Sequence, residues 1–96
     1  MEKQPNSRMC FICGLQNPVG LHMSIYNDHD NHCIYSNVVI PDQYQSYPGV
    51  VHGGIVCTIL DEAMAYTYFP DTRGVTARAE FRFRQPAPVG VPLVVT

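Results

Sequence analysis

The stretch YPGVVHGGIVCTILDEAM, residues 47–64, combines a helical apolar pattern with polar and glycine residues that core packing alone does not explain. A histidine and two glycines precede the apolar run, and the carboxylates Asp61 and Glu62 interrupt it. Five apolar side chains recur at helical spacing, which predicts a helix over residues 53–68 with one side against the core. The core-facing residues of this helix are expected to be Ile55, Val56, Ile59, Leu60 and Ala63.

Asp61 falls on the opposite side of the predicted helix, because successive residues are about 100° apart around the axis. Its neighbours there are small, whereas an exposed helix face normally carries charged residues. Small residues around a carboxylate indicate close approach of a second subunit or a ligand, and a solvated carboxylate is the alternative. Glu62 lies about 100° from Asp61, so the two cannot serve one site as a matched pair. The small neighbours are Gly54, Cys57, Thr58 and Ala65.

The glycines Gly53 and Gly54 stand in the first turn of this helix. The first N–H groups of a helix have no internal partners and carry partial positive charge. Without side chains, the backbone can approach a carbonyl oxygen and stabilise negative charge as it develops. A flexible N-terminal turn is the alternative interpretation of the pair.

The rest of the chain predicts an antiparallel sheet around the helix. Residues 21–27 and 33–40 are short β-branched or aromatic runs separated by a polar stretch, which predicts a hairpin with a longer loop. Residues 75–90 alternate as in a half-buried strand, and residues 91–96 begin another. The expected class is therefore α+β, with a helix packed on an antiparallel sheet. Residues 1–20, rich in turn formers, are expected to form a loose N-terminal arm.

The last residues, VPLVVT, are apolar and are expected to begin a strand that has no successor to pair with. A sheet that wraps one helix usually has about four to six strands. The sequence therefore predicts a chain truncated at the C-terminal strands, with a partner chain covering the open sheet edge.

The composition indicates one self-associating domain. The 96 residues fit one domain, and a charged fraction of 15%, against a usual figure of about 25%, leaves little charge to cover a monomer's surface. A net charge of -2 with six basic residues argues against nucleic-acid binding. The polar first residues and the absence of a long apolar run predict no secretory signal and no membrane span, so a cytoplasmic protein with free cysteine thiols is expected.

These motifs together resemble those of the hotdog-fold acyl-CoA thioesterases, in particular the phenylacetate-type and 4-hydroxybenzoyl-CoA-type branch. The resemblance runs through CFICG, NPVGL, YPGVVHGG, LDEAM and RQPAPVG, and its centre is a His-Gly-Gly with an acid nine residues after the histidine, from His52 to Asp61. It implies a hotdog fold over residues 21–96, a long central helix across a curved antiparallel sheet, after an arm of residues 1–20. It also implies a homodimer or a dimer of dimers with each site at a subunit interface.

The resemblance also implies roles for individual residues in thioester hydrolysis. The Gly53 N–H would polarise the thioester carbonyl, Asp61 would act as general base or nucleophile, and Thr76 would hold the water or the substrate. Ser46 stands where relatives often carry Asn or Gln, and a serine reaches less far than an amide. The implied catalytic residues are Asp61, Gly53 and Thr76, and the implied substrate-binding residues are His52, Gly54, Ser46 and Arg78.

The sequence thus predicts hydrolysis of an acyl-CoA or a related acyl thioester to the free acid and the thiol, without a cofactor. One carboxylate and one helix N-terminus would supply the base and the oxyanion site. A hotdog dehydratase or hydratase acting on acyl thioesters, with His52 catalytic, is one alternative, and a non-catalytic acyl-CoA-binding module is another. Arg78, Arg82 and Arg84 form a basic stripe that suits either the phosphates of coenzyme A or a solvated strand face.

The Cys-x-x-Cys of CFIC has three interpretations. A zinc site would need a second ligand pair at a standard spacing, and Cys10, Cys13, His22 and Cys33 match none. A redox pair is the second interpretation. The favoured one is an arm whose Cys10, Phe11 and Cys13 pack on the sheet, so no metal is expected.

Overall fold

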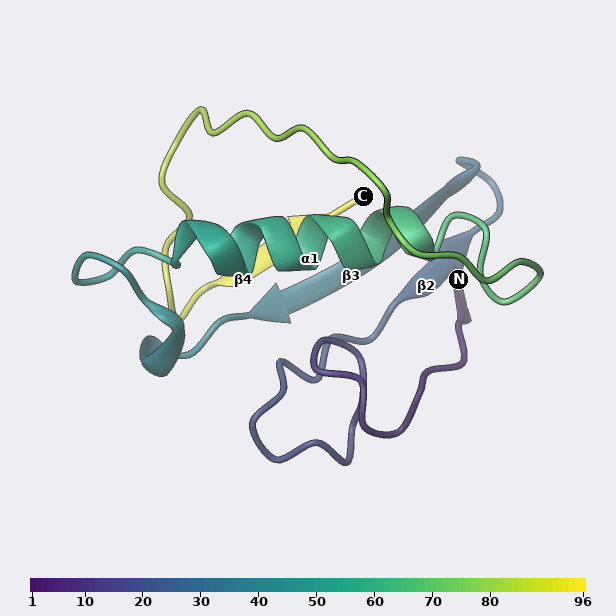
Figure 1. Ribbon diagram of the computed structural model, residues 1–96, viewed down its shortest axis with the longest axis horizontal. Coiled ribbons are helices and arrows are strands. Elements are labelled where there is room, and N and C mark those ends of the chain that lie inside the picture. Colours follow the sequence, from purple (N-terminus) through teal and green to yellow (C-terminus); the bar gives the residue numbers. More distant parts are fainter.

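One α-helix, α1 (Gly53–Ala65), lies across a four-stranded antiparallel sheet in the computed structural model, which describes residues 1–96 (Figure 1). This arrangement confirms the predicted α+β class. The strands lie side by side in chain order, and a short 3-10 helix, η1 (Asp42–Tyr44), precedes α1. The strands are β1 (Glu2–Lys3), β2 (Tyr26–Asp28), β3 (Cys33–Val39) and β4 (Pro92–Val95).

β3 is the longest strand and joins the two halves of the sheet. It pairs antiparallel with β2 on one side and with β4 on the other, where Ser36 is opposite Val95. Ile34, Ser36 and Val38 are buried, as the alternation of side chains along a strand requires. The buried Ser36 hydroxyl is satisfied by donating to the Ser24 carbonyl oxygen at 2.6 Å. The second strand of the predicted hairpin is confirmed.

The hydrophobic core lies between the sheet, α1 and the N-terminal arm. α1 contributes Ile59 and Ala63, so the helix packs on the sheet through its middle turns. The arm contributes Ile12 and Cys13, which places part of it inside the fold. The buried hydrophobic residues are Ile12, Cys13, Leu21, Met23, Ile25, Ile34, Val38, Ile40, Val51, Ile59, Ala63, Tyr66 and Val95.

The first predicted strand, residues 21–27, is largely wrong, because only its last residues belong to β2. Its alternating apolar side chains are buried, as a strand would bury them. Its backbone, however, bonds to the arm: the N–H groups of Leu21 and Met23 donate to the carbonyl oxygens of Phe11 and Ile12 at 2.9 and 2.8 Å. The alternating pattern therefore predicts the burial correctly but does not identify the pairing partner.

The arm, residues 1–20, is not loose. β1 pairs with β2, and the buried Gln4 side chain donates to the Tyr66 carbonyl oxygen at 3.0 Å. A Cβ placed on Gly14 would lie only 2.4 Å from the backbone nitrogen of Cys10, so this turn is closely packed. The turn formers fold the arm back onto the end of α1. The sequence pattern does not predict this contact between the arm and the helix.

α1 ends at Ala65, three residues before the predicted end at Tyr68. The Thr67 hydroxyl donates to the Met64 carbonyl oxygen at 2.7 Å, a local bond that competes with continuation of the helix. A membrane crossing needs about 20 apolar residues, and neither the length nor the hydropathy of this helix meets that requirement.

The helix face predicted to enter the core is only partly buried. Ile59 and Ala63 are buried, whereas Ile55 and Val56 are half-buried. Leu60 is 37% exposed, so its predicted place in the core is wrong. The sheet covers one side of α1 only, and Leu60 lies outside the area that it covers.

The strand predicted over residues 75–90 is also wrong. This segment arches along α1 as an irregular ribbon, green to yellow at the top of Figure 1, and its β-type pairing is limited to an isolated bridge between Pro88 and Val50. Phe81 is half-buried, but Phe83 is 59% exposed. The alternation gives the segment two faces, yet no strand of the chain pairs with it to form a ladder.

β4 confirms the last predicted strand and lies at the edge of the sheet, as the sequence predicts for a strand without a successor. All four of its residues pair with β3, Val95 is buried and Leu93 is half-buried. Val94 is exposed, and no strand pairs with the other side of β4.

Candidate functional site

The N-terminus of α1 presents one free backbone donor. His52 is the N-cap residue, and its Nδ1 accepts a hydrogen bond from the Gly54 N–H at 2.9 Å. The His52 carbonyl oxygen accepts from the N–H groups of Ile55 and Val56. The Gly53 N–H has no acceptor in the chain. Of the two glycines, only Gly53 therefore keeps an N–H that can bind an incoming oxyanion.

A groove of about 420 Å³ opens at this end of the helix. Gly53 and Ser46, two of the residues expected in the site, both line it. The Phe83 ring lies 3.8 Å from the position that a Cβ on Gly53 would take, so an aromatic side chain flanks the free N–H. Arg84, rather than the expected Arg78, supplies a cationic side chain to this groove.

The expected amide contact near Ser46 is replaced by loop bonds. The Ser46 hydroxyl lies 3.5 Å from the Val50 carbonyl oxygen, and Ser46 is exposed. The neighbouring Gln45 uses its Oε1 to accept from the Gly49 N–H at 3.0 Å. Ser46 is thus available to a ligand, while Gln45 holds the loop that leads to α1.

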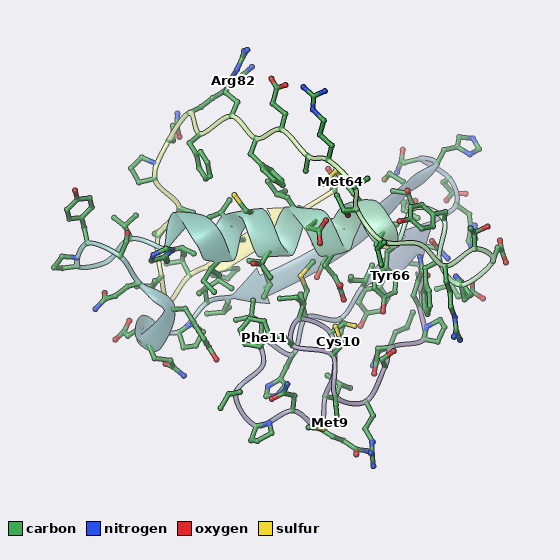
Figure 2. The ribbon with its side chains drawn as sticks, in the orientation of Figure 1. Met9, Cys10, Phe11, Met64, Tyr66 and Arg82 are labelled. Atoms are coloured by element: carbon green, nitrogen blue, oxygen red, sulfur yellow. The ribbon has the colours of Figure 1, made fainter.

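Asp61 and Thr76 meet at a second place on α1. The Thr76 hydroxyl donates to Asp61 Oδ1 at 2.5 Å, which joins the helix to the arching segment. Asp61 is half-buried and Thr76 is exposed. Arg78 and Arg82 are exposed farther along the same segment, and Figure 2 shows Arg82 pointing away from the helix.

The two places are too far apart to act on one carbonyl group within one chain. Asp61 follows Gly53 by eight residues, which corresponds to about 12 Å along a helix that rises 1.5 Å per residue. A base or nucleophile and an oxyanion donor must each lie within about 3 Å of the reacting group. The chain therefore brings Ser46 and Gly53 together, and Asp61 and Thr76 together, but keeps the two pairs apart.

Glu62, to which the sequence assigned no role, belongs to a cluster under α1. Its Oε2 accepts from the Cys10 thiol at 3.2 Å, and the Tyr66 hydroxyl donates to Cys13 Sγ at 3.1 Å. Burial, together with Glu62, raises the pKa of Cys13 to about 12. Burial, together with Cys13, also raises the pKa of Tyr66. The Cys-x-x-Cys spacing pointed to this cluster, but only the fold shows that a helix carboxylate completes it.

Comparisons with known proteins indicate the same family as the sequence motifs. A sequence profile of the thioesterase superfamily matches residues 48–96, which include α1, Asp61, Thr76 and β4. A crystal structure of a thioesterase superfamily protein superposes with a TM-score of 0.82 at 26% sequence identity, covering 91% of this chain and 43% of that one. This chain thus spans less than half the length of that protein. No curated protein matches the chain.

Proposed function

The chain belongs to the thioesterase superfamily and has its hotdog fold, and on that premise we propose that it hydrolyses an acyl-CoA or a related acyl thioester to the free acid and the thiol. The observation that carries the proposal is that α1 bears both an unbonded N–H at Gly53, where the helix begins, and a half-buried carboxylate at Asp61. Together they offer an oxyanion donor and a carboxylate, the two groups that hydrolysis requires.

In the proposed reaction, Asp61 takes a proton from a water molecule as the water oxygen attacks the thioester carbon. The negative charge that develops on the carbonyl oxygen is stabilised by the Gly53 N–H. Collapse of the tetrahedral intermediate breaks the carbon–sulfur bond, and the thiolate takes the proton from Asp61. Direct attack by Asp61 is the other route that these groups allow. Thr76 bonds Asp61 Oδ1, which leaves Oδ2 for either task.

The proposed site is shared between two copies of the chain. Because about 12 Å separates Gly53 from Asp61 along one helix, each carbonyl group needs Gly53 from one copy and Asp61 from another. Two α1 helices running antiparallel across a two-fold axis would bring these residues together twice, once at each end. The low charged fraction supports this association as a homodimer or a dimer of dimers.

The substrate would lie in the groove beside Gly53. Ser46 and Phe83 would contact the thioester region, and Arg84 in the groove, or Arg78 beyond it, would meet the phosphates of coenzyme A. His52 would act indirectly, by capping the helix and freeing its first turn for the substrate. Four free thiols fit a reducing compartment, so we place the reaction in the cytoplasm.

The decisive experiment measures thiol release from a panel of acyl-CoAs by the chain and by Asp61→Asn. We expect the substitution to lower kcat more than about a hundredfold with a much smaller change in KM, because it removes a positioned base. Asp71→Asn, an exposed carboxylate in the turn after α1, is the matched control and should keep full activity.

The same assay separates the alternative functions. A chain that releases no thiol but hydrates an enoyl-CoA, with that activity lost in His52→Ala and kept in Asp61→Asn, would indicate a dehydratase or hydratase instead. Acyl-CoA binding that persists in Asp61→Asn, without thiol release by the unsubstituted chain, would indicate a non-catalytic binding module.

A further inference from the structure

Two thiols and a carboxylate gather under α1, outside the groove and away from the Asp61–Thr76 bond. The ligating atoms of Cys10, Cys13 and Glu62 all lie within 4.8 Å of one another. We propose that these three side chains bind a divalent transition-metal ion of the Zn²⁺ type, which fastens the N-terminal arm to α1. Figure 2 shows the labelled Cys10 in the loop beneath the helix, on the same side as Tyr66.

The arm supplies two ligands in a turn that is already formed. The Cys13 N–H donates to Cys10 Sγ at 3.5 Å, and the Gly14 N–H donates to the Cys10 carbonyl oxygen at 2.9 Å. Gly14 is required, because a Cβ there would lie 2.4 Å from the backbone nitrogen of Cys10. A Cys-x-x-Cys turn is a common half of a structural zinc site, and this turn already holds both sulfur atoms within 4.8 Å of the Glu62 carboxylate.

The helix supplies the third ligand. Glu62 Oε2 lies 3.2 Å from Cys10 Sγ, and Glu62 is half-buried. No Lys, Arg or His forms an ion pair with it, since the chain's ion pair joins His29 and Glu2. Glu62 Oε2 thus has a thiol as its hydrogen-bond donor and no cationic side chain within ion-pair distance. A divalent cation supplies the missing positive charge, and both cysteines release their protons to solvent when they bind it as thiolates.

The ligand set and its surroundings favour zinc over harder cations. Thiolates select Zn²⁺ and related ions, whereas Mg²⁺ and Ca²⁺ require oxygen ligands. Zn²⁺ is usually tetrahedral, so three protein ligands leave one position for water. A cavity of about 300 Å³ adjoins the cluster and is also lined by Thr72 and Arg73, which gives that water room. The Tyr66 hydroxyl, which is shared between the Pro5 carbonyl oxygen at 2.9 Å and Cys13 Sγ at 3.1 Å, contacts the sulfur from outside the ligand set.

The location of this cluster implies a structural role for the proposed ion. Glu62 is adjacent to Asp61 in the sequence but points about 100° away around the helix, so the ion lies apart from the proposed hydrolysis. It would instead join the arm to the second half of α1. The sequence alone predicted no metal, because a ligand that is distant along the chain gives no spacing signal.

The test begins with the whole chain, reduced and treated with a chelator that is then removed. Titration with Co²⁺ should produce an intense sulfur-to-cobalt charge-transfer absorption in the near ultraviolet, saturating at one ion per chain. Zn²⁺ should then abolish that absorption by displacement. Zn²⁺ alone should also raise the melting temperature, because an ion that binds only the folded state stabilises it.

Substitutions identify the ligands. Cys10→Ser and Cys13→Ser should each reduce the charge-transfer absorption, and Glu62→Gln, which keeps size and shape, should weaken Co²⁺ binding at least tenfold while both sulfur ligands remain. Cys33→Ser and Cys57→Ser are the matched controls, since these thiols are also half-buried but lie elsewhere, and both should leave the titration unchanged.

Two results would overturn the proposal, and the first needs no variant. A reduced, folded chain without charge-transfer absorption does not bind the ion, and ready oxidation to a species lighter by two hydrogens would then identify a redox pair. If the absorption persists in Cys10→Ser and Cys13→Ser but disappears in Cys33→Ser, the ion binds instead at Cys33 and the neighbouring His32.

Discussion

At the residue scale, the free N–H of Gly53 allows activity to be separated from stability. In Gly53→Ala the added Cβ would sit 3.8 Å from the Phe83 ring, an ordinary contact, and alanine is the better helix former. We therefore expect the melting temperature to stay the same or to rise slightly. The new methyl group enters the groove where the oxyanion must approach, so kcat should fall at least about tenfold, or about 1.4 kcal/mol in activation free energy.

The measurement is kcat for acyl-CoA hydrolysis alongside a thermal melt of the same sample. Unchanged kcat in a stable Gly53→Ala variant would move the oxyanion donor to another group. A collapse in stability would instead show that the helix start cannot accept a side chain at all.

The residue scale also shows where sequence reasoning stops. Asp61 stood out because its helix face lacked the usual charges, and Gly53 because it begins a helix whose first N–H groups have no internal partners. The bond from Thr76 to Asp61 follows from the path of the arching segment, which no local pattern encodes. The helix period sets Glu62 about 100° away from Asp61 but assigns it no partner, and only the fold of the arm brings thiols to it.

At the scale of elements, the start of α1 depends on the cap that His52 provides. Its Nδ1 accepts the Gly54 N–H, and removing an N-cap acceptor typically costs about 0.5 to 2 kcal/mol of stability. We expect His52→Ala to lower the free energy of unfolding by about 1 kcal/mol. His52→Asn restores a side-chain acceptor and should recover most of that loss in a denaturant titration. Equal stability of His52→Ala and the unsubstituted chain would contradict a capping role.

The elements differ in how far their sequences determine them. α1, β3 and β4 were predicted because burial repeats within each segment at a helical or strand period. The arching segment has a strand period as clear as that of β3, yet it is no strand, because a ladder also needs a neighbour. β1 has only two residues, too few to show the alternation of apolar and polar side chains that predicts a strand.

At the scale of the whole molecule, α1 packs one side against the sheet and exposes apolar residues on another side. Leu60 and Met64 are 37% and 44% exposed, and the chain's charge is low. We expect light scattering at micromolar concentration to give two or four times the chain mass of 10.8 kDa. A stable monomer at that concentration would argue strongly against a site shared between copies.

The spacing of Gly53 and Asp61 along α1 has a genetic consequence, complementation between two defective chains. In a mixed dimer of Gly53→Ala and Asp61→Asn, one site carries both substitutions and the other carries neither. Random re-association of equal amounts should therefore recover about a quarter of the original activity from two weakly active preparations. If both residues served the same site within one chain, mixing would recover nothing.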